Sequence, residues 1–409
     1  MNNNKSQKIK IDWSGRSHGY SNKEISYLVN IIKNADPLTQ GKYLNKFEND
    51  FSNYIKKKNV FAVSSAAAAL EIIALLLNLK KGDEVIIPAH TYCASAIPFA
   101  RNGLKIVWSD INFQTRVVDI NDIRKKITKK TKAIITVSLQ GLPVDIDPII
   151  KLAKKKNLFV VEDNAQDFLG KYKNRLSGIS GDIGVWSFEN KKHLSGASEG
   201  GLIATNNKNL AEKIRKFAGI GYKNMTANGG RTSLAIETVQ DPNYKRFDTI
   251  GLNYRMPQIV AAVAYAQLKN AKKIIKKRVK TAKFFRDAIK DCKWLVEQKT
   301  PKNCKHSHYT FSVKYLQSKL NKKYSWKHIY QNYKKLGGDG FYGACAPIYS
   351  EPSIKQYFRK NNLSIKNLPN VEKIQKQIMQ FKTNYRDLNE AKKKAKILKK
   401  LINIIKNKK

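Results

Sequence analysis

The chain has 409 residues, of which 42% are hydrophobic and 10% aromatic, so it can bury a large core and wholesale disorder is excluded. The net charge of +47 would suit a polyanion, but few of the 78 basic residues are arginine. Because arginine is the preferred reader of phosphates and bases and no nucleic-acid motif is visible, we expect anionic small substrates rather than specific nucleic-acid binding. Neither a membrane-spanning apolar run nor a signal peptide is present, which predicts a cytoplasmic protein with four reduced cysteines.

The first two thirds of the chain alternate between apolar strand patterns and helical patterns. Residues 1–20 are polar and are expected to form an N-terminal arm, followed by a large domain over residues 21–265 and a small domain over 266–409. Helices are predicted from Asn22 and over Tyr43–Lys57. Strands are predicted at 60–63, 85–88, 104–108, 132–138, 158–161, 185–188 and 202–205, with helices between most of them. This alternation predicts an α/β fold with a mostly parallel sheet.

After the last strand of the predicted sheet the chain continues with helices and one more strand, and beyond about residue 270 its charge rises and its pattern changes. A helix is expected over 208–217, a polar loop over 219–248, and one long helix over Pro257–Lys290. A strand at 308–314 and helices at 324–336, 371–382 and 387–409 follow. The elements after residue 265 predict a smaller C-terminal α+β domain.

Polar residues gather at or just beyond four of the predicted strands, at Ser64–Ala67, His90–Tyr92, Asp163–Gln166 and Ser187–Lys192. Ligands of parallel sheets bind outside the carboxyl ends of the strands, so these clusters are expected to share one site. At 64–67, small residues at a strand-to-helix turn leave backbone N–H groups that can bind an anion. A simple helix cap by Ser64 or Ser65 is the alternative.

The segment between the last two strands of the predicted sheet carries adjacent lysines, Lys191 and Lys192, and closes on Glu199-Gly200-Gly201. A lysine amine forms Schiff bases, and pyridoxal 5'-phosphate (PLP) is the common carbonyl cofactor held in this way. A solvated surface pair is the alternative for these lysines. Cys304, His306 and His308 alternate along the chain, but without a clear fourth ligand no metal site is predicted.

Taken in order, these segments resemble the DegT/DnrJ-type sugar aminotransferases, which are PLP-dependent enzymes of the aspartate aminotransferase fold (fold type I). That resemblance implies a large domain with a mostly parallel seven-stranded sheet flanked by helices, and a smaller α+β domain. The matching residues are Gly41, Phe47-Glu48, Val63-Ser64-Ser65, Gly82–Pro88, Thr91-Tyr92, Glu162–Gln166, Gly181–Gly184, Ser187-Phe188 with Lys192, Glu199-Gly200-Gly201 and Gly251–Met256.

The resemblance also implies roles for individual residues. Lys192 would be the catalytic Schiff-base lysine, with Lys191 as its rival, and Asp163 would pair with the pyridinium nitrogen of PLP. Gln166 would bind the phenolic oxygen of the ring and Tyr92 would stack on its face. The phosphate would be held by Ser65, the amides of Ala66 and Ala67, Ser187, and Asn253 of a neighbouring subunit. A homodimer with shared active sites is therefore implied.

The implied reaction moves an amino group from an amino acid, expected to be glutamate, to a keto-sugar carried on a nucleotide, through pyridoxamine phosphate. Such a reaction would serve amino-sugar and surface-polysaccharide biosynthesis. Two alternatives are a deoxysugar dehydratase, which carries His at the lysine position (His193 lies one residue later here), and a non-catalytic regulatory protein. Ala67 departs from the family, which has Thr there, and this removes one hydroxyl from the phosphate site.

Overall fold

The computed structural model describes residues 19–34, 39–227, 234–365 and 368–407. Most of the predicted N-terminal arm therefore lies outside the described residues. The first described helix, α1 (Asn22–Lys33), begins with a capping box in which Ser21 and Glu24 bind each other's backbone N–H groups. Among the described residues, no helix combines the length and the apolar character needed to cross a membrane.

The centre of the fold is a seven-stranded sheet with the order β1-β9-β8-β5-β4-β2-β3. The strands β2, β3, β4, β5 and β8 pair in parallel, whereas β9 is antiparallel to both of its neighbours. The predicted mostly parallel α/β fold is thus confirmed. The bounds are β1 Asn59–Val63, β2 Glu84–Pro88, β3 Lys105–Ser109, β4 Thr131–Val137, β5 Phe159–Asp163, β8 Ile183–Ser187 and β9 Gly201–Thr205.

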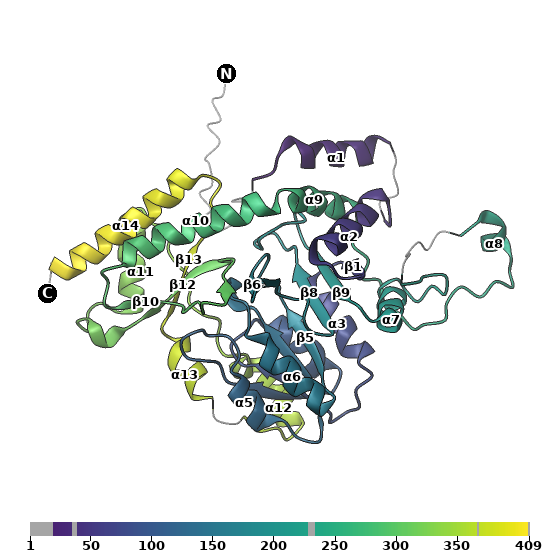
Figure 1. The fold of residues 1–409 in the computed structure, drawn as a ribbon, viewed down its shortest axis with the longest axis horizontal. Helices are drawn as coiled ribbons and strands as arrows, with labels where there is room; N and C mark the ends of the chain where they lie inside the picture. Colours follow the sequence, from purple (N-terminus) through teal and green to yellow (C-terminus); the bar gives the residue numbers. More distant parts are fainter. Residues whose placement is uncertain (1–18, 35–38, 228–233, 366–367, 408–409) are drawn as a thin grey trace.

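Helices cover both faces of this sheet (Figure 1). Successive strand residues point to opposite faces, so Val160 and Val161 of β5 belong to different cores. On one face, α2 packs Phe47 and Phe51 against Trp186 and Phe188 of the β8 segment. The helices around the sheet are α2 Lys42–Ile55, α3 Ala66–Leu76, α4 Ile97–Arg101, α5 Ile120–Lys126, α6 Ile146–Lys156 and α7 Lys208–Ala218.

A second core forms around a three-stranded antiparallel sheet of β10 (Leu295–Glu297), β12 (Thr310–Tyr315) and β13 (Ile378–Lys382). The helices α10 (Ala271–Ile289), α11 (Trp326–Lys335) and α14 (Leu388–Asn407) pack on it, and α10 and α14 lie side by side (Figure 1). A small sheet joins β6 (Lys171–Tyr172) and β7 (Arg175–Leu176) to β11 (Cys304–Lys305). The domain division at residue 265 stays a prediction.

Two of the predicted helices are wrong in detail. The helix predicted over 257–290 is divided at Asn270 into α9 (Gln258–Lys269) and α10. The helix predicted over 371–382 is α13 (Pro369–Gln375) followed by β13, because residues 378–382 pair with β12 in a register that buries most of the strand. The polar loop after α7 contains α8 (Ile236–Gln240), and α12 (Pro352–Lys360), which the sequence pattern did not predict, packs near α4.

Candidate functional site

The polar clusters that follow the strands do come together at one edge of the sheet. Asp163 ends β5, and Lys192 follows β8, its hydrogen-bonded neighbour. Asp163 is 3% exposed, whereas Lys192 is half-buried and its ammonium is close enough to act on the pKa of Asp163. The two residues predicted to be catalytic therefore share one site.

The Asp163 carboxylate is fixed from two sides. Its Oδ1 accepts from the Ala165 amide at 2.9 Å, and its Oδ2 accepts from the Ser95 hydroxyl at 2.7 Å. Thr91 in turn bonds Ser95 at 2.9 Å between the two hydroxyl oxygens. Burial raises the pKa of Asp163, and the bonds from Ala165 and Ser95, together with the Lys192 ammonium, oppose that rise. Sequence reasoning assigned no role to Ser95, because nothing in its local pattern marks it.

No salt bridge formed among the described residues includes Asp163. A buried carboxylate without a contacting cation is costly, and a protonated pyridine nitrogen would supply the missing positive charge. The site thus fits the ring of PLP at this position.

Lys192 lies beside an aromatic ring that sequence reasoning did not assign to the site. Its Nζ is 5.2 Å from the ring centroid of Tyr309, and its carbonyl oxygen accepts from the Arg278 guanidinium at 2.7 Å. Lys191 is exposed, and its backbone N–H donates to Glu189 at 3.1 Å. The burial pattern thus favours Lys192 over Lys191 as the functional amine.

The start of α3 offers free backbone donors for an anion. The Ser65 hydroxyl caps the helix by accepting from the Ala68 amide at 3.0 Å, as the alternative reading of this serine predicted. The amides of Ala66 and Ala67 precede the first intrahelical bonds and find no acceptor among the described residues. Such a helix N-terminus can bind a phosphate, which is the second part of PLP that the site fits.

Ser187, Tyr92 and Gln166 lie around the same edge. Ser187 ends β8 half-buried, and its hydroxyl accepts from the Glu189 amide at 3.3 Å. Tyr92 follows β2 with 57% of its surface exposed, which leaves its ring open to a partner. Gln166 accepts from the Gln140 amide at 2.9 Å.

Asn253 lies in the segment that runs beside the start of α3. Its neighbour Tyr254 accepts from the Ser64 amide at 2.8 Å through its carbonyl oxygen, and Asn253 itself is exposed and accepts from Arg255 at 3.0 Å. Asn253 is thus open to solvent in the single chain, on a segment that contacts the residue before the Ser65 cap.

Asp167 links the segment after β5 to the segment that precedes β12. Its carboxylate accepts from the hydroxyls of Ser177 and Ser307, each at 2.5 Å, and from the Gly170 amide at 3.1 Å. Burial raises the pKa of Asp167 to about 6, although these bonds oppose the rise. Ser307 lies two residues before Tyr309 in the chain, so the contact between Asp167 and Ser307 helps to position Tyr309.

The alternating Cys304, His306 and His308 do not form a ligand cluster. The two imidazole rings stack at 4.0 Å between centroids, and the Cys304 thiol faces the carbonyl oxygen of Pro143 at 3.9 Å. In the described part of the chain, no three or more His, Cys, Asp or Glu side chains gather as a metal site would require.

The sequence matches the DegT/DnrJ/EryC1/StrS aminotransferase family over residues 20–397. The chain belongs to that family. A curated relative, the GDP-perosamine synthase of Escherichia coli O157:H7, is 34% identical over 294 residues, covering 71% of this chain and 74% of that protein.

Solved structures share the fold of this aminotransferase. An aminotransferase from Psychrobacter cryohalolentis superimposes with a TM-score of 0.86 at 24% identity, covering 95% of this chain and 98% of that one. A GDP-4-keto-6-deoxymannose-3-dehydratase solved with a trapped PLP–glutamate adduct has a TM-score of 0.81 at 23% identity, over 93% of this chain and 98% of that one. The chain is accordingly a PLP-dependent aminotransferase of fold type I.

Proposed function

We propose that this aminotransferase transfers the amino group of an amino acid, with glutamate as the expected donor, to a keto-sugar carried on a nucleotide. The observation that carries the proposal is a half-buried lysine, Lys192, whose ammonium acts on the pKa of a buried carboxylate, Asp163, at the edge of the sheet. The name of the Escherichia coli relative supports a GDP-linked amino sugar as the product class. Lysine-rich surroundings would attract such an anionic substrate.

Each proposed residue has a physical task. PLP, when bound, withdraws electrons from the substrate carbon that carries the amine. Asp163, held by Ala165 and Ser95, would keep the ring nitrogen protonated, and the amides of Ala66 and Ala67 with the Ser187 hydroxyl would bind the phosphate. The Lys192 Nζ, half-buried beside Tyr309, would take a proton from the substrate Cα.

We further propose that the active unit is a homodimer in which Asn253 of each chain completes the phosphate site of its partner. The segment around Asn253 exposes apolar side chains that a monomer would leave in water: Ile250 is 97% exposed and Phe247 54%. In Figure 1, α8 of the same connection lies away from the main body, where a second chain could contact it. Large exposed apolar groups of this kind mark interaction surfaces.

For the compartment we propose the cytoplasm. The four cysteines of the chain, Cys93, Cys292, Cys304 and Cys345, are all free thiols. Free thiols are typical of a reducing compartment, where disulfides rarely persist. A role in surface-polysaccharide biosynthesis follows from the proposed product class.

The closest rival function is dehydration of a keto-deoxysugar, for which the family uses a histidine at the lysine position. The nearest histidine, His193, is 2% exposed, and its Nε2 lies 3.3 Å from the carbonyl oxygen of Ser307. Its ring therefore contacts the segment that precedes β12, whereas the charge that acts on the pKa of Asp163 is the Lys192 ammonium.

The proposal is tested by incubating the protein with PLP, nitrogen-15-labelled glutamate and a set of nucleotide keto-sugars. The masses of the sugar products are then measured by mass spectrometry. We expect labelled nitrogen in the sugar, its loss in Lys192→Ala, and its retention in the matched variant Lys191→Ala. A product that loses oxygen without gaining nitrogen would indicate a dehydratase. PLP binding without any amine transfer would favour a regulatory protein.

A further inference from the structure

We propose that Arg278 is a positioning residue that fixes both Lys192 and the aromatic ring beside its amine. Arg278 lies on α10, more than 80 residues along the chain from Lys192, and is 2% exposed. The inference rests on the proposed role of Lys192 as the residue that holds PLP.

The Arg278 guanidinium donates hydrogen bonds to both the Lys192 and the Tyr309 backbone. One of its terminal nitrogens donates to the Lys192 carbonyl oxygen at 2.7 Å. The other donates to the carbonyl oxygen of Tyr309 at 3.1 Å and to the Thr383 hydroxyl at 3.2 Å. The Lys192 ammonium lies 5.2 Å from the centroid of the Tyr309 ring, so one guanidinium binds the backbones of the two residues whose side chains lie together. A lysine at position 278 could not reproduce this geometry, because its single nitrogen reaches fewer acceptors at once.

Thr383 contacts both Arg278 and the backbone of the Tyr309 segment. Its hydroxyl oxygen lies 2.8 Å from the Tyr309 carbonyl oxygen and 2.7 Å from that of His308. The Tyr309 amide donates to the carbonyl oxygen of Gln140 at 3.0 Å, and the Gln140 amide donates to Gln166. Arg278 is thus connected, through Tyr309, to the loop that carries Asp163 and Gln166.

The chemistry of Arg278 points to positioning rather than to stability. No salt bridge among the described residues includes it, so its partners are neutral oxygen atoms. Burial lowers the pKa of Arg278 to about 10, which still leaves it charged at neutral pH. A buried cation without a counter-charge stabilises a fold poorly, so a geometric task accounts better for its presence.

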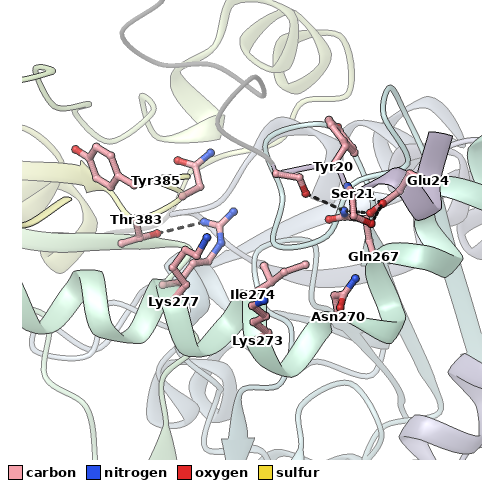
Figure 2. Close-up of a pocket in the computed structure, with 13 residues that line it drawn as sticks. Tyr20, Ser21, Glu24, Gln267, Asn270, Lys273, Ile274, Lys277, Thr383 and Tyr385 are labelled. Atoms are coloured by element: carbon pink, nitrogen blue, oxygen red, sulfur yellow. Dashed lines mark hydrogen bonds between the residues drawn. The ribbon is translucent and has the colours of Figure 1, made fainter. Parts of the chain in front are cut away.

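A pocket gives this arginine a route to solvent. It has a volume of about 310 Å³ and is bounded by the start of α1, the α9–α10 corner and the segment after β13. Figure 2 shows Tyr20, Lys273, Lys277, Thr383 and Tyr385 around it, and Arg278 is among the residues that line it. A small cation such as methylguanidinium could enter there and replace a truncated arginine.

The test compares Arg278→Ala and Arg278→Lys with the matched control Arg116→Ala. Arg116 is also 2% exposed and donates to neutral oxygen atoms, Ser312 Oγ at 2.7 Å and Val296 O at 3.1 Å, neither of which belongs to the Lys192 segment. PLP is added to the cofactor-free proteins, the adduct is reduced with borohydride, and peptide mass spectrometry identifies the labelled lysine and its rate of labelling. Steady-state turnover of the proposed substrates, glutamate and a nucleotide keto-sugar, gives kcat and KM separately.

In Arg278→Ala we expect PLP to label Lys192 at least about tenfold more slowly than in wild type. We also expect a larger fall in kcat than change in KM, since a misplacement of an ångström can lower a rate by about 100-fold. Millimolar methylguanidinium should restore part of the labelling rate in Arg278→Ala. The labelling rate of Arg278→Lys should lie between those of Arg278→Ala and wild type. Arg116→Ala should leave the labelling rate within about twofold of wild type, whatever its effect on the unfolding temperature, as remote sites act independently.

Two results distinguish failure of the proposed Lys192 site from failure of the positioning role of Arg278. Labelling of Lys191 in the wild-type protein would overturn the proposed site. Labelling of Lys192 at the wild-type rate in folded Arg278→Ala would leave that site intact and overturn the positioning role. If Arg278→Ala does not fold, the rate in Arg278→Lys and in Thr383→Val decides, and wild-type rates in both would overturn it.

Discussion

Replacing Gly201 with alanine should damage the PLP site through the backbone alone. Gly201 begins β9, and a Cβ built there would lie 2.4 Å from the Ser65 carbonyl carbon, 2.5 Å from its oxygen and 2.6 Å from the Ala66 nitrogen. These are backbone atoms at the start of α3, so none of them can rotate away. Gly201 is not among the glycines with positive φ, so the close approach, and not its own conformation, requires glycine.

The size of the effect follows from these distances. Restoring an ordinary contact of 3.4 Å from 2.4 Å requires β9 and the start of α3 to separate by about 1 Å. Overpacking of this kind costs about 1–3 kcal/mol of unfolding free energy. Because the displaced amides of Ala66 and Ala67 are the proposed phosphate donors, the Kd for PLP should rise by about 10- to 100-fold.

The neighbouring variant Gly200→Ala is a matched control. Its Cβ would lie 3.1 Å from the flexible end of Met256 and from the Phe188 Cβ, so the Met256 side chain can give way. We expect a loss below about 1 kcal/mol and a PLP affinity close to wild type. The measurements are thermal unfolding of the cofactor-free proteins and titration with PLP. A Gly201→Ala protein that matches Gly200→Ala in both would refute the reasoning.

Three further predictions concern the carboxylate behind the site, the phosphate end and the dimer. Burial raises the pKa of Asp167 to about 6 from an ordinary 3.8, so its contribution to stability is complete below about pH 4 and is lost as the pH rises through about 6, by about 3 kcal/mol. The unfolding free energy of wild type minus that of Asp167→Asn should therefore fall over this range in urea titrations, and a difference independent of pH would contradict it. Ala67→Thr should tighten PLP binding by about tenfold, because a hydroxyl in the first turn of α3 adds a bond to a charged group; an unchanged Kd would place the phosphate elsewhere. Ile250→Glu should shift the protein from dimer to monomer in light scattering and weaken PLP binding, while leaving the unfolding temperature of the single chain unchanged, because Ile250 is 97% exposed.

The architecture could be predicted from local pattern. Apolar segments such as Val85–Pro88, alternating with helices, indicate a parallel sheet whatever the details of packing. The carboxyl ends of parallel strands share one edge, so Asp163 and Lys192 could be expected to meet although 29 positions separate them in the numbering. For the same reason, the clusters after β1 and β2 could be assigned to the site.

Tertiary structure decided what surrounds those residues. Residues 378–382 have a pattern compatible with a helix, and only pairing with β12 makes them a strand. Ser95, Tyr309 and Arg278 have no local signal, because their roles come from distant partners: Ser95 binds a carboxylate 68 positions away, and Arg278 a carbonyl 86 positions away. Periodicity records which face of an element is buried, but it does not record which element lies against that face. The groups that hold the reactive side chains in place are therefore visible only once the chain has folded.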